Sequence, residues 1–310
     1  MPITNDALVA SLGFVQSQTT YVEAQVNQTI YPGIQYPDLI PVDTSAPEMA
    51  TTVTYYGGDK FGSADWINGN ADDIPLAGTL RQQFQTAVYT AGIGYGWGWE
   101  EVERARMLGT SLQADDAMAA REAYENFVDN IALWGDTTKS FQGFLTNSGV
   151  TPGSAVTGAW GGGVTTTDEV LGDINAAIIA SATATLQTAM ADSLLLPVAK
   201  LQYLASTPRS STSDTTLLEF IQRTNVYTAT TGRPLFIRGV RGLETAGAGS
   251  TNRMVTYRRS PQVVKLHIPM THRFLPVHRT GVLNYVVPGV FRLGGVDIRR
   301  PKEVQYTDGI

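Results

Sequence analysis

Residues 124–147 read YENFVDNIALWGDTTKSFQGFLTN and contain the end of a long predicted helix. The helix is expected from about Gln113 to Trp134, because apolar residues recur there at helical spacing: Ala117, Ala120, Tyr124, Phe127, Val128 and Ile131. Gly135 is well placed to end the helix, since glycine readily adopts the left-handed conformation found at helix C-termini. At 1.5 Å per residue the helix would be roughly 33 Å long, which suits the spine of a large domain.

The segment at the N-terminal end, residues 1–48, is punctuated by prolines. They follow Tyr31, Tyr36, Ile40 and Ala46. Proline removes a backbone donor and pushes the residue before it toward extended geometry. This segment is therefore expected to be an extended arm that lies on another surface, because alone it could not bury itself.

A long hairpin is expected after the arm. Residues 49–56 and 84–95 are predicted strands by their β-branched and aromatic content. The Gly- and Asp-rich stretch between them contains Phe61 and Trp66. Because a connection of this length is uncommon within a compact domain, the two strands are predicted to project from the body. Aromatic side chains on such a hairpin would need a partner to cover them.

Residues 92–99 alternate strictly as GIGYGWGW. In a strand, this pattern places the large side chains on one face and the glycines on the other. The spacing is not that of a phosphate-binding loop. The alternation therefore predicts a strand with one bare face that another backbone can approach closely, and not a nucleotide site.

The C-terminal half mixes helices and strands. Thr166 and Glu169 form a capping box, and the apolar stripe that follows (Val170, Ile174, Ile178, Leu186) predicts a helix to about Met190. A buried strand is expected at 194–197, with helices to about Leu204 and at 217–223. Residues 255–268 and 282–306 are rich in strand formers. The order of elements predicts an α+β fold.

Charge is divided unevenly along the chain. Residues 1–199 hold 6 Lys or Arg and 22 Asp or Glu, a net charge of −16. Residues 200–310 hold 16 Lys or Arg and 6 Asp or Glu, a net charge of +10. The basic part could pair with acidic surface on the same chain or a neighbour, or it could bind nucleic acid. The first interpretation is favoured, because nucleic-acid-binding domains are usually basic and this chain has a pI of about 5.1.

Groups that carry chemistry are sparse. The chain has no cysteine, which excludes disulfides, thiolate metal sites and cysteine nucleophiles. Its three histidines, His267, His272 and His278, are spaced unsuitably for a shared metal on one strand and are expected to be structural or surface residues. The adjacent carboxylates Asp72-Asp73 and Asp115-Asp116 point in different directions and are expected to be solvated.

The motifs of several enzyme classes are also missing. The sequence has no Walker A, G-x-S-x-G, H-E-x-x-H or EF-hand pattern. It also has no signal-peptide pattern at its start and no apolar stretch long enough to span a membrane, so a soluble protein made in the cytoplasm is expected. The sequence predicts a structural protein and not an enzyme, with no catalytic residues, metal or cofactor. An enzyme with an unrecognised site is a weaker alternative.

Taken in order, the arm, long hairpin, long helix, Gly-ended turn, α/β insertion and returning strands resemble the Hong Kong 97-type capsid fold. The stretch from Tyr124 to Asn147 is similar to the end of the spine helix in phage capsid proteins and encapsulins. The resemblance is strongest to the encapsulin-related family of tailed-phage major capsid proteins. It implies an N-arm at 1–48, an E-loop at 49–95, a P-domain at 96–165 and 255–310, and an A-domain at 166–254.

The resemblance further implies a self-assembling protein. Copies would form pentamers and hexamers that close into an icosahedral shell around phage double-stranded DNA, assembled in the host cytoplasm. Scaffolding, portal and decoration proteins are possible further partners. The alternative within the same fold is an encapsulin-like cellular compartment that holds protein cargo. A decoration or tail protein of the same virion is a weaker alternative, because such proteins usually lack the long helix. The loops at 206–216 or 225–233 would lie near the capsomer axis.

Six residues are candidates for the assembly interface: Lys60, Phe61, Trp66, Arg81, Arg258 and Arg259. The first four lie on the expected hairpin. Arg258-Arg259, like Arg299-Arg300, is a dense basic pair whose default role is in salt bridges. Lys60 is the only lysine that a covalent crosslink of the kind known in some relatives could use. Because no partner Asn can be matched by motif, no crosslink is expected.

Overall fold

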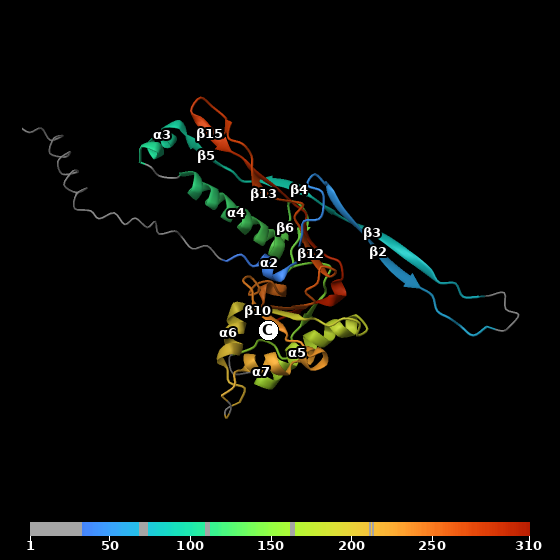
Figure 1. Cartoon of the computed structure of the whole chain (residues 1–310). Coiled ribbons are helices and arrows are strands. Elements are labelled where there is room, and N and C mark those ends of the chain that lie inside the picture. Colours follow the sequence, from blue (N-terminus) through green and yellow to red (C-terminus); the bar gives the residue numbers. More distant parts are fainter. Residues whose placement is uncertain (1–32, 68–73, 109–111, 162–164, 211, 213) are drawn as a thin grey trace, which may run out of the picture. The chain divides into compact units, whose positions relative to one another are not determined.

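The computed structural model describes residues 33–67, 74–108, 112–161, 165–210, 212 and 214–310 (Figure 1). All of them except Gly33 belong to one unit, Ile34–Ile310, and the description below concerns that unit. Most of the expected N-terminal arm and the carboxylates Asp72-Asp73 lie outside the described residues.

The long helix is α4, Leu112–Trp134, and it confirms the prediction to within one residue at its start. Tyr124, Val128 and Ile131 are buried along one face, whereas Phe127 stays partly exposed. The preceding short helix is α3, Trp99–Leu108.

Gly135 ends α4 with φ of +83°. A Cβ at this position would lie 2.3 Å from the Phe141 carbonyl oxygen, so the turn requires glycine for two reasons. The chain then doubles back through β6 (Gly135–Asp136) and β7 (Phe141–Gln142). The amides of Phe144 and Leu145 donate to the Ala132 and Leu133 carbonyls, which satisfies acceptors that every helix end leaves open.

The predicted hairpin is present, and its paired part is longer than expected. Strand β2 (Thr52–Phe61) pairs antiparallel with β3 (Gly78–Ala87) in continuous register from Thr52↔Ala87 to Phe61↔Gly78. Pairing continues through Gly57 and Gly58, which local strand propensity alone would have excluded. The single strand expected at 84–95 is divided into the end of β3, β4 (Tyr89–Gly92) and the start of β5 (Tyr95–Gly98).

The glycines of the alternating stretch allow the close approach predicted for them. Strand β5 pairs with β15 (Asn284–Val287), and β4 pairs with β16 (Gly289–Leu293). A Cβ on Gly94 would lie 2.3 Å from the Val287 carbonyl oxygen. Strand β14 (His278–Arg279) adds to β15, and β13 (Met270–Phe274) adds to β16, so each pair becomes a three-stranded sheet.

The expectation of a purely extended arm is wrong for its last part. Tyr36–Leu39 forms a helical turn, α2, with Pro37 in the first turn, where a missing N–H costs nothing. Tyr36, Leu39 and Ile40 are buried in the core, and Asp129 on α4 accepts a hydrogen bond from the Tyr36 amide at 2.8 Å. The chain continues into β1 (Val42–Asp43), which pairs with β12 (Val264–His267), and β12 in turn pairs with β17 (Gly295–Ile298).

The largest sheet has five strands in the order β10-β9-β11-β18-β8. Their bounds are Phe236–Gly239, Ser193–Leu196, Arg253–Tyr257, Val304–Asp308 and Pro152–Ser154. Strand β8 occupies an edge, where proline is tolerated. The helices of this part are α5 (Thr167–Ala184), α6 (Val198–Ser206), α7 (Leu217–Thr224) and α8 (Val226–Thr231), with 3-10 turns η1 (Ala248–Ser250) and η2 (Pro301–Glu303).

Helix α5 starts at the predicted capping box, in which Thr166 and Glu169 bond reciprocally. Its expected end near Met190 is wrong, because the helix stops at Ala184. Leu186 and Gln187 adopt positive φ of 53° and 59°, a conformation that cannot continue a helix. Leu186 is consequently exposed and does not extend the buried stripe.

Arg253 and Asp308 form a buried ion pair between β11 and β18. Two Arg253 nitrogens reach the two Asp308 oxygens at 2.6 and 2.9 Å, and a third donates to the Leu145 carbonyl at 2.8 Å. The guanidinium also lies 4.6 Å from the Tyr306 ring centroid. The pair therefore links the central sheet to the turn that follows α4.

Removal of one partner of this pair is expected to destabilise the fold. Asp308→Ala leaves Arg253 buried without a counter-ion, which should lower the unfolding free energy by about 3–5 kcal/mol. Asp168→Ala removes the exposed partner of Arg209 and should cost less than about 1 kcal/mol. Urea denaturation of the unassembled protein measures both, and equal losses would contradict the assignment.

A second prediction compares two identical substitutions in different backbone conformations. Gly135→Ala introduces a clash and strain and should destabilise the protein by about 1–3 kcal/mol. Gly172→Ala lies within α5 with no atom within 4 Å of the new Cβ, and should raise stability by about 0.4–1 kcal/mol. Thermal unfolding of both variants checks whether the sign of the effect differs.

Candidate assembly interface

The hairpin carries exposed large apolar side chains that do not reach either buried cluster of the body. Trp66 is fully exposed, Leu76 is 85% exposed and Leu80 is 64% exposed. Tyr56, Phe61, Ile67 and Ile74 are also exposed. A two-stranded ribbon is marginal alone, and an exposed apolar surface of this kind is typical of sites that bind another molecule.

Burial along β2 shows where the support of the hairpin stops. Val53, Tyr55 and Gly57 are partly buried while their neighbours Thr54 and Tyr56 are exposed, as expected for a strand with one covered face. From Gly58 to Phe61 every residue is exposed. The outer part of the hairpin therefore has no cover on either face within the described chain.

Four of the six candidate residues lie on this outer part. Lys60 and Phe61 are at the end of β2, Arg81 on β3 is paired with Gly58, and Trp66 lies in the segment beyond the strands. The Phe61 ring lies across Gly78, where a Cβ would be 2.5 Å from the ring. Neither Lys60 nor Arg81 makes an ion pair with the residues that the structure describes, so both charges are available to a partner.

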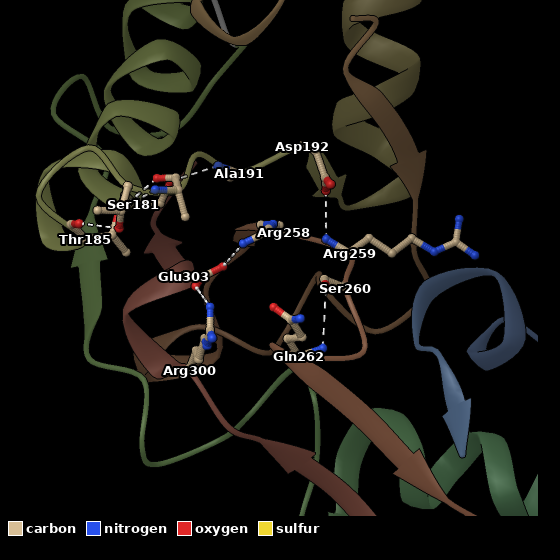
Figure 2. A network of polar contacts seen from close by, with 12 residues as sticks. Ser181, Thr185, Ala191, Asp192, Arg258, Arg259, Ser260, Gln262, Arg300 and Glu303 are labelled. Carbon is tan, nitrogen blue, oxygen red and sulfur yellow. Dashed lines mark hydrogen bonds and ion pairs between the residues drawn. The ribbon is translucent and has the colours of Figure 1, made fainter. Parts of the chain in front are cut away.

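The other two candidates, Arg258 and Arg259, belong to a different element, the connection between β11 and β12. Figure 2 shows Arg258 and Arg300 both directed at Glu303, with nitrogen to oxygen distances of 3.1 Å for each. The Arg259 amide donates to Asp192 at 2.7 Å, while its guanidinium lies 5.5 Å from the Phe236 ring centroid. The expected salt bridge is therefore present for Arg258, whereas the Arg259 guanidinium is exposed beside an aromatic ring.

A second exposed apolar surface was missed by sequence reasoning. Trp99, Val102 and Met107 are exposed on α3, and further exposed side chains lie at 274–283: Phe274, Leu275, Val277, Val282 and Leu283. The amide of Trp99 donates to the Leu283 carbonyl, which joins the two segments. The pattern of large residues in 274–283 could have indicated this surface, but in sequence it is indistinguishable from a buried strand.

The three histidines have structural or surface positions. His272 is buried, with Nε2 3.1 Å from the Ile93 carbonyl oxygen and its ring stacked on Tyr124. His267 is buried with Asp43 and Asp297 each 3.8 Å away, and His278 is exposed on β14. Among the residues that the structure describes, no group of three His or carboxylate side chains could hold a metal ion.

The expectation that Asp115 and Asp116 are both simply solvated is wrong for Asp116. Its carboxylate accepts a hydrogen bond from Trp97 Nε1 at 2.5 Å, which ties β5 to the start of α4. Neighbours on a helix point in different directions, so Asp115 remains exposed.

The uneven charge of the sequence is partly neutralised within the chain, as the favoured interpretation predicted. Acidic residues of the first part pair with basic residues of the second: Asp38 with Arg238, Asp43 with Lys265, Glu48 with Arg273, Asp129 with Arg241 and Asp168 with Arg209. Burial alone would raise the pKa of Asp43, but hydrogen bonds from Lys265 and Ser45 outweigh it and hold that pKa well below its usual value.

None of the helices in the described ranges is both long and apolar enough to cross a membrane.

Comparison with known proteins agrees with this geometry. The family model of the major capsid protein matches residues 62–310. The fold is similar to the capsid of Myoviridae phage XM1, with a TM-score of 0.80 and 18% identity over 95% of this chain and 98% of that one. It is also similar to the capsid of the native GTA particle, with a TM-score of 0.61 and 13% identity over 98% of both chains.

A virus-like particle from Pyrococcus furiosus is a more distant match, with a TM-score of 0.50 and 13% identity over 88% of this chain and 91% of that one. No curated protein matches in sequence. The encapsulin-like alternative is therefore less well supported than a phage capsid, and the Hong Kong 97-type α+β fold is confirmed. With most of its length matched by the family model, the chain belongs to the major capsid protein family and is a structural protein of a capsid shell.

Proposed function

We propose that copies of this chain assemble as pentamers and hexamers into an icosahedral shell around phage double-stranded DNA, with the hairpin of each copy covered by a neighbour. The observation that carries this proposal is the uncovered outer hairpin, Gly58–Phe61 and Gly78–Gln83, with its exposed apolar side chains. Many weak contacts of this kind per copy would make a shell stable through multivalency. A capsid of similar fold, that of the GTA particle, was computed with fivefold symmetry, which supports pentamers.

In this proposal the chain divides as its resemblance to the fold family implies. Residues 1–48 are the N-arm, 49–95 the E-loop, 96–165 with 255–310 the P-domain, and 166–254 the A-domain. Two buried clusters support the last division. One gathers around α4 and includes Tyr257 and Tyr306, and the other gathers around α5 and includes Leu194 and Leu196.

The candidate residues take separate roles. Phe61 and Trp66 supply apolar area to a neighbour, and Lys60 and Arg81 supply charges that set the register of the contact. Arg258 and Arg259 form a second contact on the body, either with acidic surface of another copy or with packaged DNA by non-specific attraction. Scaffolding, portal and decoration proteins are further partners, and assembly takes place in the host cytoplasm.

Deletion of the outer hairpin tests the proposal directly. Gly57 pairs with Gln82, so replacing residues 58–81 by Asn-Gly closes the strands with a two-residue turn. We expect a folded, soluble protein with the melting temperature of the body nearly unchanged and no closed shells in negative-stain electron microscopy. The intact chain, treated identically, should give closed shells or rings of five and six. Normal shells from the deletion variant would exclude the hairpin as the assembly element.

A single substitution tests the apolar contact. Trp66→Ala removes the most exposed aromatic side chain and should raise the protein concentration needed for shell formation by roughly tenfold or more, because a buried interface tryptophan often contributes about 2 kcal/mol or more. His278→Ala removes an exposed side chain outside the hairpin and should have a smaller effect. Light scattering against concentration compares the two, and equal shifts would count against a role for Trp66.

A further inference from the structure

The hairpin is connected to the body by side chains at one specific level. At its foot the ladder of the ribbon ends with the Val88 amide donating to the Thr51 carbonyl at 2.9 Å, and the buried Val88 side chain attaches this point to the body. One fixed point leaves the direction of the hairpin undetermined. A second set of contacts lies farther out, at Tyr55 and its partner Phe84 on β3.

Tyr55 is held by two charged residues of β17 and the segment that follows it. The Arg299 guanidinium carbon lies 4.4 Å from the Tyr55 ring centroid. The Asp297 carboxylate accepts a hydrogen bond from Arg299 Nε at 3.0 Å. Its other oxygen lies 3.5 Å from the Tyr55 hydroxyl oxygen. The Tyr55 ring also stacks on Phe84, with centroids 5.1 Å apart and planes 16° apart. These four residues, Tyr55, Phe84, Asp297 and Arg299, are called the clasp.

The clasp is partly buried, which strengthens its charged contacts. Arg299 and Asp297 keep only 22% and 11% of their side-chain surface exposed. Burial raises the pKa of Tyr55, and the Asp297 charge adds to this effect, so the hydroxyl stays protonated and can donate to Asp297. His267 approaches the same carboxylate at 3.8 Å without a hydrogen bond at Nε2.

Packing elsewhere at the hairpin foot is open. A cavity of about 420 Å³ separates Gln85, Thr86 and Ala87 of β3 from the 138–142 turn and from residues 296–298 of β17. A loosely filled space cannot fix a direction, so the clasp has to supply the second fixed point. Beyond it, Gly57 makes room for the Phe84 ring, since a Cβ there would lie 3.0 Å from Phe84, and Gly58 follows with no support.

We propose that Arg299 and Tyr55 are positioning residues that set the direction in which the hairpin leaves the body. The outer hairpin begins at Gly58, beyond the level that the clasp holds. The partner is a second copy of this chain, whose surface the hairpin can reach only in the held direction. This part of the inference rests on the proposed shell function, whereas the clasp itself can be tested in unassembled protein.

Hydrogen–deuterium exchange of the purified full chain, below the concentration at which shells appear, tests the clasp. Arg299→Met removes the cation and keeps the length of the side chain. We expect amides of 52–56 and 83–87 to exchange about tenfold faster, since a partly desolvated cation–π contact with its ion pair contributes that much to local stability. Arg299→Lys keeps the charge without the planar guanidinium and should fall between wild type and Arg299→Met. Tyr55→Leu should reproduce the effect of Arg299→Met while leaving the ion pair intact.

The residues next to Arg299 and Tyr55 in sequence, Arg300 and Tyr56, serve as matched controls for the exchange experiment. Arg300→Met alters an arginine that pairs with Glu303 instead, and Tyr56→Leu alters a tyrosine on the uncovered face of β2. Neither should change exchange at the hairpin foot. Wild-type exchange in Arg299→Met, or equal acceleration in Arg300→Met, would overturn the clasp.

Shell imaging by negative stain then tests the consequence for assembly. If wild type forms shells, Arg299→Met should form fewer or irregular ones while its melting temperature changes little. Regular shells at wild-type yield from Arg299→Met, despite faster exchange, would overturn the positioning role. Failure of the wild-type chain to form shells would count against the proposed function alone, because the exchange result stands without it.

Discussion

The alternation of side chains across the central sheet is the constraint on which the rest of the fold depends. Along β9, Leu195 faces the cluster around α4, while Leu194 and Leu196 face the cluster around α5. The same rule places Val255 and Met254 of β11 in opposite clusters. Because a strand has a period of two, one sheet serves both cores, and a slip of one residue would exchange every contact. The buried pair of Arg253 and Asp308 fixes that register.

A body organised in this way leaves one element unsupported. Both cores are filled by segments of the chain itself, including the α2 turn, so no buried position remains for the outer hairpin. In the proposed shell its apolar side chains are covered by a neighbouring copy, and the low content of charged residues, 16%, agrees with a surface that is largely hidden in an assembly. In that proposal, neighbouring copies complete the structure of each subunit.

Elements governed by local rules could be predicted from the sequence. Helix α4 follows from its periodicity, its end from Gly135, and the start of α5 from the capping box. The predictions failed where tertiary contacts overrode local preference. Burial of Tyr36 and Leu39 stabilises a helical turn in a proline-rich segment, and the positive φ of Leu186 ends a helix whose apolar pattern continues. The contact between Tyr55 and Arg299 joins residues far apart in sequence, so no local pattern indicates it.

The charge distribution bears on both the folding of one subunit and the contacts between copies. Pairs such as Asp43 with Lys265 and Asp129 with Arg241 bring the acidic first part against the basic second part within one subunit. Lys60 and Arg81 on the hairpin, and the exposed guanidinium of Arg259 on the body, are not used in this way by the described residues. Charges that do not contribute to folding are the ones available for recognition between copies, where complementary placement determines register more than affinity. The ion pairs thus hold the body together, whereas the unused cations lie on the surfaces where assembly is proposed.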